Sequence, residues 1–239
     1  MADPVGREGA PRGPYKNGLK RRREIVEAAA LVFGQYGYHG GSLRTIAEMV
    51  GTTPATLVSH FTSKEGLLAA VLEYWRDSTD EQHSADDVGL NFFRAYIPLM
   101  RYHVAHRGFL ELFLTMATEA TQLDHPARPF IVERQRLTMD TVVRELNRAI
   151  ESGQVSAMTA EEVDIEAVLT ISVLDGAELQ WLLSPSLDLE GIVRHHIDAA
   201  LARWTGRSIA DVSRETTEWL RSRSPRAGEA APDTPVGED

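Results

Sequence analysis

The sequence predicts an all-α fold, with a three-helix unit near the N-terminus and a larger helical domain after it. Apolar residues recur at three- to four-residue spacing along most of the chain. No run of alternating β-branched residues bounded by turn residues predicts a strand. The length of 239 residues, with 43% hydrophobic and 25% charged residues, is that of an ordinary globular protein able to bury a sizeable core.

Composition excludes several classes of protein. The chain contains no cysteine, which excludes disulfides and thiolate metal sites. Residues 1–18 are rich in proline, glycine and charge and lack the apolar stretch of a secretory signal. No apolar run approaches the roughly 20 residues that span a bilayer. We therefore expect a cytoplasmic protein without a membrane partner. Residues 1–18 are expected to be a disordered basic arm and residues 222–239 a disordered tail.

Charge is distributed unevenly along the chain. Residues 1–75 carry nine Lys/Arg and seven Asp/Glu, a net charge of +2, whereas residues 76–239 carry sixteen and twenty-eight, a net charge of -12. The positive charge gathers near the N-terminus, in Lys16, Lys20, Arg21, Arg22 and Arg23. This cluster has two interpretations, a basic arm that enters the minor groove of DNA or the solvated start of a helix.

The first two helices follow from their caps and breaks. An apolar stripe predicts a helix over residues 19–36, and Gly37 suits the left-handed position after its C-terminus. Ser42 is a good N-cap for a short helix that runs to Val50. Gly51 ends this second helix.

The third and fourth helices are also marked by their first residues. Thr53 caps the third, with Pro54 in the first turn, where a missing N–H costs nothing. Thr62 and Glu65 have the spacing of a capping box for a fourth helix that reaches residue 75.

The rest of the chain is helical in pattern as well. Residues 77–87 are polar and are expected to form a loop, and Pro98 should kink the helix that follows it. Thr159 and Glu162 form a second capping box. The predicted helices are 87–106, 109–119, 126–153, 159–184, 189–205 and 208–220.

Residues 42–60 meet the steric demands of a helix-turn-helix. Ala47 is small enough for the next helix to cross closely, and Gly51 can adopt the positive φ of a tight turn. Leu57 returns to the same core as Ile46. In this motif the second helix enters the major groove of DNA, although three-helix folds without a DNA function share the geometry. Methyls and hydroxyls suited to base edges and phosphates belong to Thr52, Thr53, Ala55, Thr56 and Ser59.

The longer run GYHGGSLRTIAEMVGTTPATLVSHFTSKEGLLAAVLEYW resembles the N-terminal domain of the tetracycline-repressor (TetR) family. Shared features are an aromatic residue and glycine before the second helix, IAE-x-x-G in the turn, and TL-x-x-HF-x-SKE-x-LL running into the fourth helix. The resemblance implies a DNA-binding domain at residues 19–76, with a reading unit at about residues 44–63. Residues 77–221 match the family only in being helical and of the usual length, and they would form a ligand-binding and dimerisation domain.

By this resemblance the third helix reads bases, the start of the second approaches DNA, and Lys64 meets a phosphate at the N-terminus of the fourth. Val58 departs from the family, which usually has an aromatic residue there. The phosphate-contacting hydroxyl of a tyrosine is thus absent, and Ser59 and His60 are expected to replace it in part. The residues expected to contact DNA are Arg44, Thr45, Thr52, Thr53, Pro54, Ala55, Thr56, Ser59, His60 and Lys64.

A single helix-turn-helix buries little DNA surface, so we expect a homodimer on a palindromic operator. The apolar stripes of the predicted helices 159–184 and 189–205 are candidates for a four-helix interface, and the resemblance implies the same. The alternative is that both stripes face the core of their own subunit. The expected interface residues are Val163, Thr170, Leu174, Ala177, Trp181, Val193, Ile197 and Leu201.

The resemblance also implies a pocket for a small-molecule inducer between these helices and the reading unit. Aromatic and methionine side chains at helical spacing either line it or belong to the core, and a largely apolar lining favours a hydrophobic ligand. In the usual mechanism the inducer favours a state in which the fourth helix swings and the two reading heads no longer match the grooves. The candidate lining residues are Phe93, Tyr96, Met100, Phe113, Met116 and Trp181.

Other functional classes find little support. His103 and His106 lie three residues apart on a predicted helix, but no dense metal-binding motif occurs, so we expect no metal and no cofactor. No nucleophile elbow, phosphate-binding loop or dinucleotide fingerprint predicts an enzyme. The sequence therefore predicts a sequence-specific DNA-binding transcriptional repressor released by a ligand. The alternative is an activator, or a helical ligand-binding protein with weak DNA affinity.

Overall fold

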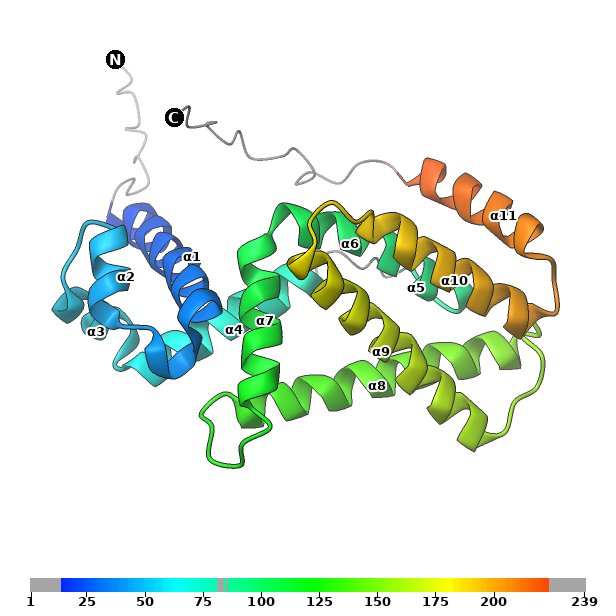
Figure 1. Cartoon of the computed structure of the whole chain (residues 1–239), viewed down its shortest axis with the longest axis horizontal. Coiled ribbons are helices and arrows are strands. Elements are labelled where there is room, and N and C mark those ends of the chain that lie inside the picture. The colour runs from blue at the N-terminus through cyan, green and yellow to red at the C-terminus, as the bar shows by residue number, and fades with distance from the viewer. Residues whose placement is uncertain (1–13, 81–83, 85, 224–239) are drawn as a thin grey trace, which may run out of the picture.

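A computed structural model describes residues 14–80, 84 and 86–223, and within them it forms eleven helices and no strand (Figure 1). The all-α prediction is therefore confirmed. Helices α1 to α3 form a compact head at one end of the molecule, and α4 runs from this head into the larger group of helices. In the described residues no helix is long and apolar enough to cross a membrane.

The first helix is longer than predicted. Helix α1 spans Pro14–Gly40, so the last residues of the predicted arm already belong to it, while residues 1–13 lie outside the described residues. The predicted end after residue 36 appears as a break inside α1, where Gly37 has φ 69° and ψ 173°. A side chain at Gly37 would also collide with Glu119, because its Cβ would lie 2.1 Å from the Glu119 carboxylate.

Caps define the next helices. Ser42 Oγ accepts from the Thr45 N–H and starts α2 (Leu43–Met49), and Thr53 Oγ1 accepts from the Thr56 N–H and starts α3 (Pro54–Phe61). The predicted capping box at residue 62 is wrong, because Thr62 has φ 68° and ends α3. Ser63 caps α4 (Lys64–Asp80) instead, accepting at 3.1 Å from the Gly66 N–H.

The segment after α4 differs from the prediction in two ways. Helix α4 continues to Asp80, so the expected loop is shorter, and part of it (residues 81–83 and 85) lies outside the described residues. The single helix expected over 87–106 is two helices, α5 (Leu90–Arg94) and α6 (Tyr96–Ala105). The break falls at residue 95 because Pro98 has no N–H to donate to the carbonyl four residues earlier, and its ring crowds that carbonyl.

The remaining helices match the prediction closely. Pro129 in the first turn suits the start of α8, which begins two residues later than expected. The second capping box is confirmed, since Thr159 and Glu162 exchange side-chain to backbone hydrogen bonds at the start of α9. The bounds are α7 (Arg107–Glu119), α8 (Arg128–Glu151), α9 (Ala160–Leu183), α10 (Leu189–Thr205) and α11 (Ile209–Ser222).

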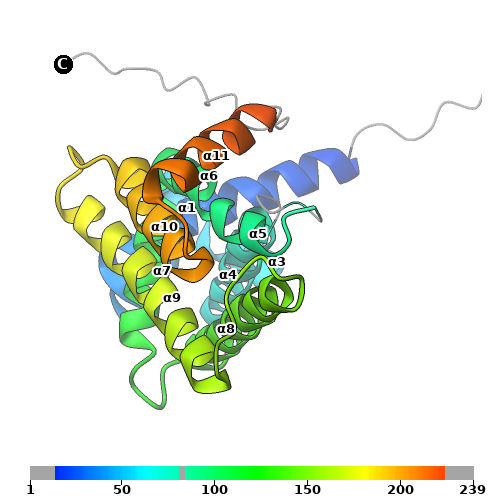
Figure 2. The same cartoon turned by 90° about the vertical axis from the view of Figure 1, so that its right-hand side faces the viewer.

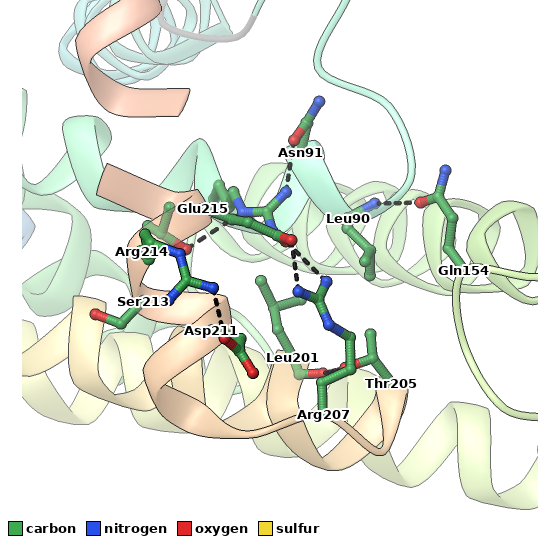
Figure 3. A network of polar contacts seen from close by, with 12 residues as sticks. Leu90, Asn91, Gln154, Leu201, Thr205, Arg207, Asp211, Ser213, Arg214 and Glu215 are labelled. Carbon is green, nitrogen blue, oxygen red and sulfur yellow. Dashed lines mark hydrogen bonds and ion pairs between the residues drawn. The ribbon is translucent and has the colours of Figure 1, made fainter. Parts of the chain in front are cut away.

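Helix α11 lies along the outer side of α10, as both views show (Figures 1 and 2). It buries Val212 and Thr216. Thr216 Oγ1 donates to Asp198 of α10 at 2.7 Å and accepts from Arg94 of α5 at 3.3 Å. On its outer face Arg207 pairs with both Glu215 oxygens (Figure 3). The segment predicted at 208–220 is therefore a helix that ties α5 to α10, while tail residues 224–239 lie outside the described residues.

Two hydrophobic cores divide the molecule. One joins the head to α7, and the other joins α5, α6 and the helices from α8 to α11. Glycines allow a close crossing between α1 and α7: a Cβ on Gly34 would lie 3.0 Å from the Leu112 nitrogen, and one on Gly108 would lie 2.6 Å from Leu31. This crossing fixes the head against α7, which also contacts helices of the second half of the molecule, α5 to α11.

The stripes predicted as a dimer interface lie in the second core of the single subunit, and their contact with a partner stays a prediction. Each is at most 8% exposed in the single subunit, because the stripes pack against α6, α7, α8 and each other. Side chains buried to this extent in their own subunit leave little surface for a partner. The residues concerned are Val163, Thr170, Leu174, Ala177, Trp181, Val193, Ile197 and Leu201.

Candidate nucleic-acid interface and ligand cavity

The predicted helix-turn-helix is present with the expected core. Ile46 and Ala47 of α2 and Leu57 of α3 are at most 1% exposed. Gly51 adopts φ 61° in the turn, and the Thr52 N–H donates to the Ala47 carbonyl at 2.9 Å. The positive φ explains why glycine occupies this position.

Arg21 of α1 braces the turn, a role that the sequence analysis missed. Its guanidinium donates to the carbonyls of Val50 and Gly51 and pairs with Glu24 at 3.0 Å. These carbonyls lie at the C-terminal end of α2, where no helical N–H reaches them. Arg21 was expected in a phosphate-binding cluster, and no sequence pattern indicated this contact across 29 residues.

Two neighbouring arginines are also used within the subunit. Arg22 lies over the Phe61 ring at 4.4 Å, and Arg23 lies over the Tyr74 ring at 5.6 Å. Arg23 also pairs with Glu27 at 2.8 Å, which is the first cause of its raised pKa. These contacts favour the interpretation of the cluster as the start of a helix, with Lys20 still 79% exposed at its side chain.

Helix α3, which is expected to read bases, presents a surface of small groups. Its exposed residues are Pro54, Ala55, Val58, Ser59 and His60, and Thr53 at its cap. Thr52 and Thr56 are partly exposed. Val58 is 43% exposed, so the residue that departs from the family pattern lies on the surface rather than in the core.

The hydroxyls of α3 are partly occupied by the helix itself. The Thr53 and Thr56 hydroxyls lie 3.0 Å apart, and Ser59 Oγ donates to the Thr56 carbonyl at 2.7 Å. Each hydroxyl keeps a lone pair for an N–H donor on a base edge, whereas a contact with a phosphate oxygen requires the hydroxyl proton to turn away from its partner within the helix. On α2, Arg44 is exposed and pairs with Glu48 at 2.9 Å, and Thr45 is partly exposed.

A small polar cluster joins the head to α7. Tyr38 donates to Glu65 at 2.6 Å, and this hydrogen bond is the first cause of the lowered Glu65 pKa, about 2. The Tyr38 N–H donates to Glu119 of α7 at 3.0 Å. Lys64 lies 4.5 Å from the Tyr38 ring centre and donates to the His39 carbonyl at 3.4 Å. Lys64 is thus held at the first turn of α4, on the side of the head.

A cavity region lies among α4, α6, α7, α8 and α9, and it consists of two adjacent chambers. The outer chamber has a volume of about 570 Å³ and the inner one about 70 Å³. Both are lined by Tyr96, Leu99, Arg134 and Thr138, so Arg134 stands where they meet. The inner chamber is completed by Trp75, Met100, His103, Phe113, Ile131, Gln135, Ile171, Leu174, Asp175 and Glu178.

Half of the predicted lining residues lie elsewhere. Tyr96, Met100 and Phe113 line the inner chamber. Phe93 packs edge-on against Trp204 in the core, with ring centres 4.8 Å apart. Met116 and Trp181 also belong to hydrophobic cores, Met116 to the one that joins the head to α7. Helical spacing alone did not separate cavity-facing side chains from core side chains.

The lining of the inner chamber is mostly apolar, in keeping with the expectation, but it also includes a buried polar cluster. His103 Nδ1 lies 2.6 Å from Glu178 Oε1, and both side chains are buried. Burial, followed by the charge of Glu178, raises the pKa of Asp175 to about 6. The sequence carried a signal for this pair, because Asp175 and Glu178 are the charged residues of the second half of α9, residues 167–183, and lie at helical spacing.

The histidines considered for metal binding do not converge. His106 stacks on the Tyr102 ring with centres 4.0 Å apart, whereas His103 faces Glu178. Among the described residues no group of three or more His, Asp or Glu side chains is arranged to hold a metal ion.

Comparisons with known proteins agree with this geometry. The profile described as "Bacterial regulatory proteins, tetR family" matches residues 25–71. The chain is 29% identical to the transcriptional repressor AcnR of Corynebacterium diphtheriae over 160 residues, which cover 65% of this chain and 78% of AcnR.

Solved structures share the fold. A TetR-family regulator from Agrobacterium tumefaciens aligns with a TM-score of 0.64 at 20% identity, covering 78% of this chain and 98% of that one. AibR, solved with isovaleryl coenzyme A and operator DNA, aligns with a TM-score of 0.56 at 23% identity, covering 79% of this chain and all of AibR. The helix-turn-helix, the profile match and these relatives together lead to one conclusion: residues 25–71 match the DNA-binding domain of the TetR family, and the chain is similar to transcriptional regulators of that family.

Proposed function

We propose that this regulator is a cytoplasmic repressor that binds a palindromic operator as a homodimer and is released by a small molecule in the two-chamber cavity. The observation that carries the proposal is the position of helix α4, which links the head to the cavity. Its first residue, Lys64, lies beside the exposed face of the head, and Trp75 and Thr79 near its other end line the cavity. A ligand that repacks one end of a stiff helix therefore displaces the other.

We infer that the DNA contacts are made by the exposed face of α2 and α3. The residues that would make these contacts are Arg44 and Thr45 at the start of α2, the turn and cap residues Thr52, Thr53 and Pro54, and Ala55, Thr56, Ser59 and His60 of α3. Phosphate contacts would fix the register, and methyl and hydroxyl groups would read bases in the major groove. Lys64 would meet a phosphate beside the head. The head would span residues 14–76, and the regulatory domain the described residues beyond them.

The dimer would form through the outer face of α9 rather than through the buried stripe. Its apolar side chains there are about half exposed or more, and they recur at helical spacing, namely Ile165, Val168, Leu169, Leu179 and Leu183. Ser172 and Gly176 lie on the same face and allow close approach, since a Cβ on Gly176 would meet nothing within 4 Å. A continuous apolar face of this length is typical of an interface between subunits.

The DNA-binding part is tested by mobility shift on the region upstream of the gene. The double variant Thr56→Ala, Ser59→Ala removes two hydroxyls of α3 without touching the core. We expect affinity to fall about tenfold or more, because each lost specific contact costs about 1–3 kcal/mol. Ser156→Ala, an exposed hydroxyl between α8 and α9, is the control. Equal affinity of the double variant and wild type would contradict the assignment of α3.

The dimer is tested by sedimentation. Leu169→Glu, Leu179→Glu places two charges on the exposed face of α9 and should produce monomers. Val132→Glu, Leu137→Glu places the same charges on exposed positions of α8 and should leave the dimer intact. A dimer that survives the α9 changes would exclude this face.

A further inference from the structure

The inner chamber brings acidic and basic side chains together, with His103 beside Glu178. Asp175 and Glu178 contribute two carboxylates, and Arg134 contributes the guanidinium. No hydrogen bond or ion pair joins the Asp175 carboxylate to any side chain in the described part of the chain. A carboxylate withdrawn from water in this way is stabilised by an opposite charge brought close to it.

His103 adds an unused acceptor. The residue is 6% exposed, and its Nδ1 lies 2.6 Å from Glu178 Oε1. Its other ring nitrogen, Nε2, is buried and has no hydrogen-bond partner. In the neutral ring with the proton on Nδ1, Nε2 carries a lone pair, so it accepts from an N–H donor. Buried polar atoms without a partner are uncommon, and here the atom belongs to a residue that lines a cavity.

The walls of the chamber are aromatic. Trp75 of α4 and Phe113 of α7 stack with centres 4.6 Å apart, nearly parallel. The Arg134 guanidinium lies 3.9 Å from the Trp75 ring centre and 5.1 Å from that of Phe113. The face of an aromatic ring attracts cations, and Arg134 therefore shows that a planar cation fits this position.

We propose that the inner chamber binds an organic ammonium ion, a protonated amine on an aromatic or other apolar body, with Asp175, Glu178 and His103 Nε2 as its recognition groups. This inference rests on the proposed function and names the class of its ligand. Without ligand, the guanidinium of Arg134 takes the position over Trp75 that the ammonium group of the ligand would occupy. The incoming ammonium displaces it from Trp75 toward the outer chamber, which removes a contact between α8 and α4.

An anionic ligand would meet the opposite situation. It would add a third negative charge beside the two carboxylates, and Arg134 and His103 are the basic groups of the lining that would oppose it. The outer chamber contains more arginines, but Arg144 and Arg148 there are already paired with Glu145 at 3.2 and 3.1 Å. The charge distribution thus discriminates between ligands by sign.

The test compares three ligands of one skeleton, phenethylamine, phenethyl alcohol and phenylacetate, by titration calorimetry on the full chain without DNA. We expect the amine to bind about tenfold more tightly than the alcohol and the carboxylate to bind weakest. Equal or tighter binding of phenylacetate would overturn the proposal. So would the absence of saturable binding of the amine up to about 10 mM, the range expected for a ligand of this size.

Variants separate charge recognition from general packing. Asp175→Asn should reduce amine affinity about tenfold and leave the alcohol unchanged, because it keeps shape and removes charge. Arg134→Met should raise amine affinity, since the internal competitor is gone, and a fall would overturn the competitor role. Glu161→Gln, an exposed carboxylate at the start of α9, is the control. Melting curves for each variant verify folding.

A separate measurement distinguishes the proposed ligand class from the proposed function, release of the operator by a ligand. Mobility shift with operator DNA measures release by phenethylamine. Binding of the amine without release would contradict the coupling through α4 and leave the ligand class intact. Operator binding that persists while the amine fails to bind would contradict the ligand class alone.

Discussion

The head and the regulatory half differ in what they bury. In the described side chains of the head, residues 18–76, the buried groups are apolar, whereas all ten buried polar or charged residues lie at position 79 or later. The core of the head is thus apolar, and it supports the exposed surface of α2 and α3 that we propose contacts DNA. The regulatory half buries paired charges such as His103 with Glu178 and Arg94 with Asp198 through Thr216, which a ligand or a proton can perturb.

The largest effect should come from the apolar core of the head. Leu57→Ala removes a side chain that is 1% exposed and should destabilise the protein by about 2–5 kcal/mol, with loss of operator binding. Its neighbour Val58 is on the surface, so Val58→Ala should change stability by less than about 0.5 kcal/mol. Urea unfolding followed by circular dichroism measures both. Similar losses in the two variants would refute the division between core and surface on α3.

The next effect tests the buried charges. Arg94→Met should cost about 1–3 kcal/mol, because it removes the buried N–H that the Thr216 oxygen accepts from, next to the Thr216–Asp198 hydrogen bond. Arg136→Met removes an exposed arginine with two carboxylate partners on α8 and should cost less than about 1 kcal/mol. Thermal unfolding compares them. If the exposed arginine matters as much, burial does not govern the strength of these networks.

A smaller effect has the opposite sign. The folded-state pKa of Asp175 is raised to about 6 by burial, then by Glu178, against the lowering charges of Arg134 and His103. The folded state therefore holds this proton more tightly than the unfolded state, and the stability it contributes is lost as pH rises from about 4 through 6. Asp175→Asn should stabilise the protein at pH 7 by about 1–2 kcal/mol.

The pH dependence separates this cause from others. The advantage of the asparagine variant should shrink as the pH falls to about 4, because the wild-type carboxyl is then protonated in both states. Melting temperatures across this range check the sign. An advantage that stays constant with pH would mean that Asp175 is not the titrating group.

The smallest effect concerns a single phosphate contact. Lys64→Gln should leave stability unchanged and reduce the slope of log affinity against log salt by about 0.9 for each lost contact. Arg136→Gln, far from the head on α8, should leave the slope at its wild-type value. An unchanged slope for Lys64→Gln would mean that this lysine serves only its contacts with Tyr38 and His39.

The same difference explains what could be predicted from the sequence. The helix-turn-helix positions Ala47, Gly51 and Leu57 follow from local spacing and a single apolar core. The proposed dimer face could not be predicted from the sequence, because α9 carries apolar residues on both sides. Periodicity does not say which side packs against its own subunit. Arg21 and Arg134 act through contacts 29 and 59 residues away in sequence, and only the folded chain brings them together.

Footprinting of the dimer on its operator tests the central claim, that a rigid head reads DNA and the cavity controls it through α4. We predict two protected half-sites about one helical turn apart, related by a two-fold axis, and loss of both together when phenethylamine is added. Protection of a single half-site, protection that the ligand does not change, or no protection at about micromolar protein would contradict the account.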